Sequence, residues 1–127
     1  MSVTLPKTSL TAAGYLAIER AVETKSEFFN GEMFAMAGTT KNHARIVMNF
    51  GGELRARFKG RTCEPFATDL RVKVEANGLY TYSDLVVVCG GQRFEDDQLD
   101  TLMNPTLIVE VFRRDFHEKQ KGSSSDK

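Results

Sequence analysis

The sequence lacks a long hydrophobic run and an excess of charge of either sign. No window approaches the roughly 18 consecutive apolar residues of a membrane-spanning helix, so we expect no membrane span. The 17 basic and 17 acidic residues cancel. This balance argues against binding through a global basic field, although it allows a local phosphate-facing patch. The N-terminal residues lack the pattern of a secretory signal, which favours a cytoplasmic protein.

Cysteine is also scarce. Cys63 and Cys89 have no metal-ligand spacing and make a poor disulfide framework, so we predict two free thiols in a reducing compartment. With 127 residues, the chain has the length of a single domain, which we place at residues 1–127.

Two apolar runs, each with one carboxylate, stand out from the rest of the sequence. Asp84 begins the apolar part of residues 79–88, and Glu110 lies within residues 106–111. Both runs are rich in β-branched residues and are bounded by turn-forming residues, so we predict two short strands. Continuous apolar runs are typical of strands that are covered on both faces.

A carboxylate in such a strand costs several kcal/mol unless it is paired, hydrogen-bonded or bound to a metal. The simplest interpretation is that Asp84 and Glu110 meet and share a cation. The alternatives are that Asp84 is a turn residue bonded to nearby amides and that Glu110 lies in water on an edge strand.

The remaining patterns predict helices and hairpins around these strands. Apolar residues at steps of three and four indicate a helix through residues 10–21, capped by Thr8 or Ser9, and a second over 41–59. The second helix would bury Val47, Phe50, Leu54 and Phe58. Asn-Gly pairs at 30–31 and 77–78 predict tight turns in two hairpins, one over residues 27–36 and one joining residues 69–75 to the strand at 79–88.

Three further polar residues are candidates for the same site. Glu32 directly follows the first turn and is either a solvated residue or a third acid of the site. His43 falls on the buried face of the second helix, as a packing residue or a functional one. Asp69 and Asp84 would lie on paired antiparallel strands toward the same end of the hairpin, which favours a cation site.

Basic residues gather at two places. The second helix ends in cations that are either a solvated face or a phosphate-contacting patch. The strict alternation of residues 69–75 predicts a half-exposed strand whose charged side chains share one face. The candidate nucleic-acid-binding residues are Arg55, Arg57, Lys59, Arg71 and Lys73.

A set of short motifs in fixed order spans residues 10–111. They are Tyr15-Leu16 with Glu19-Arg20, residues 27–32 with Met36-Ala37-Gly38, Asn42-His43, residues 69–72, Tyr82-Ser83-Asp84, Asn104-Pro105 and Val109-Glu110-Val111. In order and spacing they resemble the Uma family of restriction endonucleases, a branch of the PD-(D/E)XK nuclease superfamily.

The resemblance implies an α+β fold with a restriction-endonuclease-like core over residues 8–111, in which a central mixed sheet with hairpins is flanked by helices. It also implies hydrolysis of DNA phosphodiester bonds with Mg²⁺ or Mn²⁺. Asp84 and Glu110 would be the catalytic acids and metal ligands, and Glu32, His43 and Asp69 would match other polar positions of the pocket, with Asp69 as a further metal ligand. Ser83 stands where the family more often has proline.

The resemblance weakens after Val111. The lysine of the superfamily pattern would stand two residues after Glu110, where this chain has Phe112. We expect residues 112–127 to be a truncated or altered, disordered tail, and Lys119 or Lys121 is a possible substitute for the lysine. Loss of the closing helix would uncover the sheet and favour a homo-oligomer. The alternative function is a noncatalytic nucleic-acid-binding or degenerate nuclease-fold protein.

Overall fold

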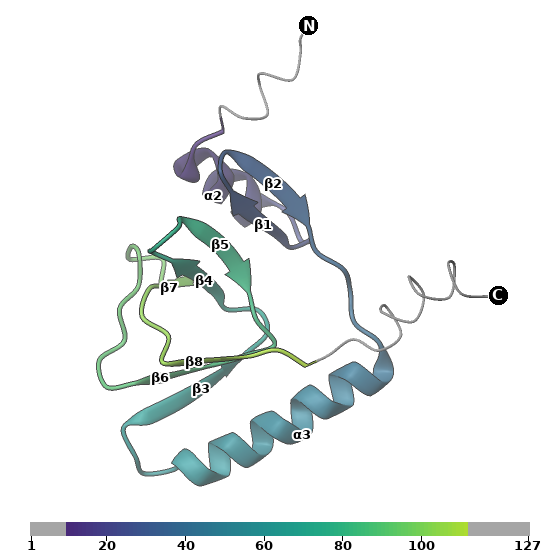
Figure 1. Ribbon diagram of the computed structural model, residues 1–127, viewed down its shortest axis with the longest axis vertical. Coiled ribbons are helices and arrows are strands. Elements are labelled where there is room, and N and C mark those ends of the chain that lie inside the picture. Colours follow the sequence, from purple (N-terminus) through teal and green to yellow (C-terminus); the bar gives the residue numbers. More distant parts are fainter. Residues whose placement is uncertain (1–9, 112–127) are drawn as a thin grey trace, which may run out of the picture.

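The computed structural model describes residues 10–111, which form two helices and eight strands in an α+β fold (Figure 1). The predicted fold class is confirmed. The candidate caps Thr8 and Ser9 and the predicted tail at 112–127 lie outside the described residues.

Helix α2 (Ala12–Ala21) and a β-hairpin form the first part of the chain. The helix is capped by Thr11, whose side chain accepts a hydrogen bond from the Gly14 amide at 3.0 Å. Strands β1 (Ser26–Phe29) and β2 (Glu32–Ala35) pair in antiparallel register. Asn30 and Gly31 between them have φ of 55° and 82°, which are the positive angles of the predicted type I′ turn.

Helix α3 (Lys41–Phe58) confirms the second predicted helix and begins at the cap Thr40. His43 and Val47 are buried on it, but the predicted burial of Phe50 is wrong, since 42% of that residue is exposed. The helix approaches the sheet at Gly51 instead, where an added Cβ would lie 3.2 Å from Leu85 Cδ2. Neither helix between residues 10 and 111 is long and apolar enough to cross a membrane.

The strands are divided between two sheets. The five-stranded sheet has the order β2-β1-β5-β4-β7 and is mixed, because β7 is parallel to β4 and the other pairs are antiparallel. The three-stranded sheet has the order β3-β6-β8 and is antiparallel. The remaining bounds are β3 (Cys63–Ala67), β4 (Arg71–Val74), β5 (Leu79–Tyr82), β6 (Leu85–Cys89), β7 (Thr101–Leu102) and β8 (Leu107–Val109).

The predicted strand at 79–88 is in fact two strands. Strand β5 ends at Tyr82 and β6 begins at Leu85, so the chain leaves one sheet and enters the other at Ser83-Asp84. Asp84 therefore lies at the junction of the two sheets. The predicted pairing of Asp69 with Asp84 within a strand ladder is wrong, because the β4–β5 ladder ends at the pair Arg71 and Tyr82.

Only one of the two apolar runs is covered as predicted. Residues 85–88 of β6 are buried between its two neighbours. In β8, however, Leu107 and Ile108 are 48% and 40% exposed. Strand β8 pairs only with β6 among the described residues and is the edge of its sheet, which leaves these side chains open to solvent.

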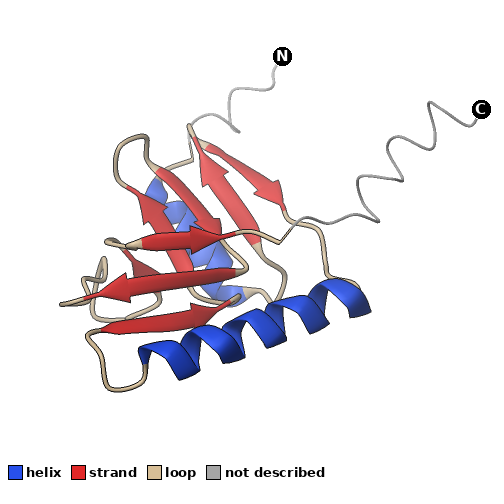
Figure 2. Ribbon diagram, turned by 60° about the horizontal axis from the view of Figure 1, so that its bottom comes forward, coloured by secondary structure: helices blue, strands red, loops and turns tan. Residues whose placement is uncertain are grey.

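The two helices cover different parts of the fold. Helix α3 runs alongside β3, whereas α2 packs near β1 against the five-stranded sheet (Figure 2). Tyr15 of α2 stacks on Phe28 and lies against Tyr80, with ring centroids 5.0 and 5.3 Å away. A second buried cluster consists of Val72, Val86, Val88 and Leu102.

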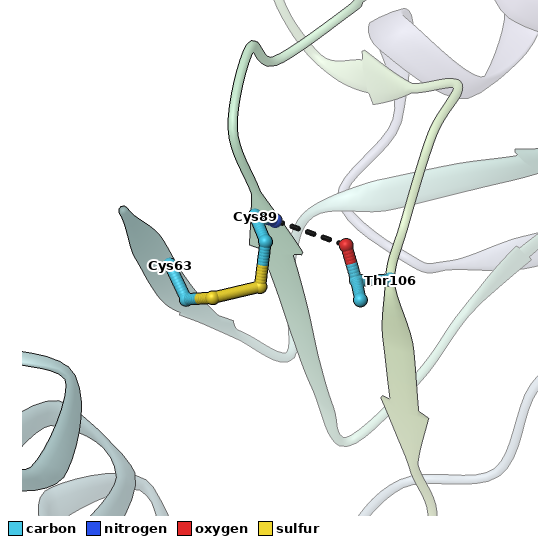
Figure 3. The surroundings of a disulfide bond; sticks show 3 residues. All are labelled: Cys63, Cys89 and Thr106. Atoms are coloured by element: carbon cyan, nitrogen blue, oxygen red, sulfur yellow. Dashed lines mark hydrogen bonds between the residues drawn. A yellow bond between two sulfur atoms is a disulfide. The ribbon is translucent and has the colours of Figure 1, made fainter. Parts of the chain in front are cut away.

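A disulfide joins Cys63 and Cys89 at one end of the three-stranded sheet (Figure 3). The prediction of two free thiols is therefore wrong. The two residues stand directly opposite each other in the β3–β6 ladder, with Cα atoms 3.9 Å apart. Because the sequence did not reveal β3 as a strand, it could not reveal this pairing. Beside it, Thr106 Oγ1 accepts a hydrogen bond from the Cys89 amide at 2.9 Å.

Candidate active site

A pocket of about 1000 Å³ opens where the two sheets meet. Its walls come from the segment after β2, one side of α3 from His43 to Arg55, strand β3 and the junction between β5 and β6. Val47, Phe66 and Leu85 give it an apolar wall. Five acids line the pocket: Glu27, Glu64, Asp69, Asp84 and Glu110. Apolar walls with a few converging polar groups are typical of a binding or active site.

Asp84 is held in a fixed orientation. Its Oδ2 accepts a hydrogen bond from the Val111 amide at 2.6 Å and lies 3.1 Å from Nε2 of His43. The side chain is 13% exposed. No donor among residues 10–111 binds the other oxygen, Oδ1, so one carboxylate oxygen is fixed and the other is left for a ligand.

His43 reaches Asp84 from the first turn of α3. It is 6% exposed, and its second ring nitrogen, Nδ1, lies 2.8 Å from Thr39 Oγ1. Because a carboxylate accepts and cannot donate, the imidazole donates from Nε2 to Asp84. The structure brings His43 into contact with Asp84 in the same pocket, and this contact orients the Asp84 side chain.

Glu110 stands beside Asp84 at the end of the three-stranded sheet. Leu85 pairs with Val109 in the β6–β8 ladder, so Asp84 and Glu110 are the next residues along the two strands. Burial raises the pKa of the Glu110 carboxyl, and the charge of Asp84 raises it further. The nearby Ser83 hydroxyl and His43 lower it, and Glu27 raises it. The carboxylates therefore meet as predicted and repel each other.

The donor set at this point suits a magnesium-like ion. The Ser83 hydroxyl is buried and lies near the Glu110 carboxyl, where it lowers the pKa of that group, but it forms no hydrogen bond of good geometry within residues 10–111. Beside it lie two hard carboxylates whose repulsion a divalent cation would relieve. Mg²⁺ is usually held by only one or two carboxylates together with waters and phosphate oxygens. Within residues 10–111, no three His, Cys, Asp or Glu side chains are grouped to hold a metal, so Asp69 does not complete a three-ligand set.

Glu27 is a site residue that the sequence reasoning missed. It lies on β1, lines the pocket, and adds to the negative field that acts on Glu110. Its Oε2 accepts a hydrogen bond from the Thr81 hydroxyl. The alternation of side chains along a strand could have indicated its place. Because Phe28 is buried in the core, the neighbouring Glu27 must point to the opposite face of the sheet.

The other two predicted acids lie elsewhere. Asp69 lines the pocket, but its side chain is 93% exposed and forms an ion pair with Lys25 at 3.1 Å. Glu32 is the first residue of β2, opposite Phe29, and does not line the pocket. Of the two acids in this hairpin, the structure thus places Glu27 in the pocket rather than Glu32.

The predicted basic residues do not form one patch. Arg55 lines the pocket, whereas Arg57 pairs with Glu53 along the exposed side of α3, and Lys59 is the exposed residue that ends this helix. Lys73 pairs with Glu95 at 3.5 Å. Only Arg55 of this group reaches the candidate site.

Arg71 was predicted on an exposed face, and this is wrong, because only 6% of the residue is exposed. Its Nη1 donates to Thr101 Oγ1 at 2.8 Å and lies 3.3 Å from Asp100, and its Nε donates to the Tyr82 hydroxyl at 3.1 Å. Tyr82 in turn donates to Glu19 at 2.7 Å. These contacts commit Arg71 to the interior, which the alternating pattern could not indicate.

Comparisons with known proteins identify the family of the chain. The family Uma2, described as “Putative restriction endonuclease”, matches residues 12–120, which includes every residue of the pocket and extends past Val111. No solved structure is significantly similar to the chain.

Two curated relatives are uncharacterized proteins of Synechocystis sp. One is 36% identical over 80% of this chain and 58% of its own length. The other is 31% identical over 95% of this chain and 63% of its own length. The chain thus spans about six-tenths of the length of these relatives.

Proposed function

The chain belongs to the Uma2 restriction endonuclease family, and we propose on this basis that it is a metal-dependent endonuclease that hydrolyses DNA phosphodiester bonds. The observation that carries the proposal is the adjacent pair Asp84 and Glu110. The two carboxylates stand at the ends of neighbouring strands, inside a pocket, with no arginine or lysine paired to either among residues 10–111.

Asp84 and Glu110 would hold Mg²⁺ or Mn²⁺, with the Ser83 hydroxyl beside them. When bound, such an ion stabilises the charge that develops on the phosphate and lowers the pKa of a bound water. Burial and the charge of Asp84 raise the pKa of Glu110. A divalent cation bound between the two carboxylates would offset their repulsion, and this supports the assignment.

The protein's own groups prepare this site. His43 and the Val111 amide fix one oxygen of Asp84, so the other is presented without a search among rotamers. The apolar wall of Val47, Phe66 and Leu85 lowers the local dielectric, which strengthens every charge interaction inside the pocket. Arg55 supplies a cation on the α3 side for a phosphate of the DNA backbone.

The test is nicking of supercoiled plasmid by the purified chain in Mg²⁺, in Mn²⁺ and in EDTA. Asp84→Asn and Glu110→Gln remove the charge of each acid while keeping its shape. Glu75→Gln is the matched control, because Glu75 pairs with Arg93 on the surface and does not line the pocket.

We expect nicking that requires metal, is lost in the two pocket variants and is retained in Glu75→Gln. Nicking that survives both pocket variants would contradict the proposal. DNA binding without any nicking would instead favour a noncatalytic nucleic-acid-binding protein.

A further inference from the structure

We propose that Lys25 contacts the phosphate that is hydrolysed in this site, an inference that rests on the proposed function. Of the lysines between residues 10 and 111, only Lys25 lines the pocket. It shares that pocket with Asp84 and Glu110. The superfamily pattern that places a lysine two residues after Glu110 is unfilled here, since that position is Phe112.

The hairpin places Lys25 on the correct face. Lys25 precedes β1 by one residue, and its carbonyl accepts a hydrogen bond from the Met36 amide at 3.1 Å, which continues the β1–β2 ladder. Side chains two residues apart on an extended segment share a face. Lys25 therefore points to the same side as Glu27, toward the pocket and away from the core residue Phe28.

The contacts of Lys25 show where an anionic oxygen is held. Its Nζ lies 3.1 Å from Asp69 Oδ1 and 5.4 Å from the centre of the Tyr82 ring. The Asp69 side chain is 93% exposed. An ion pair with so exposed a carboxylate contributes little to stability, so a phosphate oxygen can take the place of Asp69 at the ammonium group.

Lys73 has the same kinds of contact but cannot act in the same way. Its Nζ lies 5.3 Å from the centre of the Tyr80 ring and 3.5 Å from Glu95. Glu95 is only 23% exposed and also accepts a hydrogen bond from the Tyr80 hydroxyl at 2.6 Å. Its carboxylate is therefore held in place, and Lys73 does not line the pocket.

Lys25 contacts a non-bridging phosphate oxygen and stays protonated throughout. In the hydrolysis a water oxygen bonds to phosphorus and releases one proton to the solvent, the phosphorus–oxygen bond to the leaving strand breaks, and the leaving oxygen takes up one proton from the solvent. The ammonium group balances the negative charge that develops on the phosphate.

The role of Lys25 is tested with the variants Lys25→Met and Lys25→Arg, and Lys73→Met is the matched control. The first measurement is the affinity for a short duplex oligonucleotide in EDTA, between roughly 50 and 200 mM NaCl. We expect the slope of log affinity against log salt to fall in magnitude by about 0.9 in Lys25→Met, as for one lost phosphate contact. The slope should be retained in Lys25→Arg and Lys73→Met.

The second measurement is plasmid nicking with Mn²⁺. Lys25→Met should lower kcat by at least about tenfold, as loss of a group that stabilises transition-state charge does. Mn²⁺ should stabilise the Lys25→Met variant as much as it stabilises the wild type, because Asp84 and Glu110 hold the ion. Equal slopes and equal nicking in Lys25→Met and Lys73→Met would overturn the assignment.

The two proposals fail in different ways. A wild-type chain that does not nick overturns the endonuclease, and the salt slope still decides whether Lys25 contacts phosphate. A wild-type chain that neither nicks nor binds the duplex overturns both. Nicking by the wild type with an unchanged slope in Lys25→Met overturns Lys25 alone.

Discussion

Two groups of acids differ in the side chains that surround them, and Tyr82 contacts both regions, since it lines the pocket and its hydroxyl accepts a hydrogen bond from Arg71. In the first, which we call the arginine network, Asp96 and Asp100 accept hydrogen bonds from Arg20, and Arg71 lies against Asp100. In the second, the pocket, the charges of Asp84 and Glu27 act on Glu110, and the side chain that bonds to Asp84 is the imidazole of His43 rather than an arginine or a lysine.

The pKa values follow this difference. The hydrogen bond from Arg20 lowers the pKa of Asp100 to about 2, and burial opposes this only in part. Burial and the charge of Asp84 raise the pKa of Glu110. Acids that stabilise a fold are paired with cations, whereas acids held close together without a cation are a cost to the fold. Such a cost supports the proposal that the pocket is the functional region.

The largest expected effect comes from breaking the arginine network. Arg71→Met removes a buried cation and leaves the groups around it without a partner, which should lower the free energy of unfolding by about 3–5 kcal/mol. Arg93→Met is the control, because Arg93 pairs with Glu75 on the surface and should contribute at most about 1 kcal/mol. Urea unfolding measures both, and equal losses would mean that the network is not structural.

Substitution of one acid from each group should change the stability by a smaller amount and in opposite directions. Asp100→Asn should lower the free energy of unfolding by about 1 kcal/mol, a value reduced for screening because its side chain is 35% exposed. Glu110→Gln should raise it in metal-free buffer, because it removes the repulsion with Asp84. If both variants lose stability, the contrast between the groups fails.

The pH dependence gives the smallest effect. The lowered pKa of Asp100 means that its contribution is present above the ordinary value of 3.8 and is lost as the pH falls toward about 2. The raised pKa of Glu110 means the reverse: stability is fully present below the ordinary value of 4.5 and is lost as the pH rises through the raised pKa.

Unfolding in metal-free buffer at a series of pH values checks this prediction. Lowering the pH toward 4.5 should stabilise the wild type, and Glu110→Gln should abolish that gain. Asp100→Asn should weaken the loss below 3.8. A wild-type stability that does not respond to pH above 4.5 would contradict the state assigned to Glu110.

Local patterns were enough to predict most of the elements. The Asn30-Gly31 turn and the helix from Lys41 depend on neighbouring residues, and both were correct. The meeting of Asp84 and Glu110 was also predictable. Asp84 directly precedes the apolar strand β6 and Glu110 directly follows the apolar strand β8, so the two acids meet when these strands pair in antiparallel order. The break at Ser83-Asp84 was not, since the change of sheet does not interrupt the apolar run.

The missed features depend on contacts between distant residues. The alternating pattern predicts that Arg71 is exposed on its strand. It is buried because Thr101 and Asp100, about thirty residues later in the chain, contact its guanidinium group. The Cys63–Cys89 disulfide needs β3 to be recognised beside β6. Glu27 could have been placed in the pocket by the alternation of its strand once Phe28 was assigned to the core.

The most direct test of the contrast is the stabilisation of the chain by Mn²⁺. Urea unfolding of the wild type at increasing Mn²⁺ should show a gain that reaches about 2.7 kcal/mol at 100 times the dissociation constant. Asp84→Asn and Glu110→Gln should lose this gain, and Asp100→Asn should keep it. A wild-type chain that Mn²⁺ does not stabilise, or a Glu110→Gln chain stabilised as much as the wild type, would contradict a metal site at the acid pair.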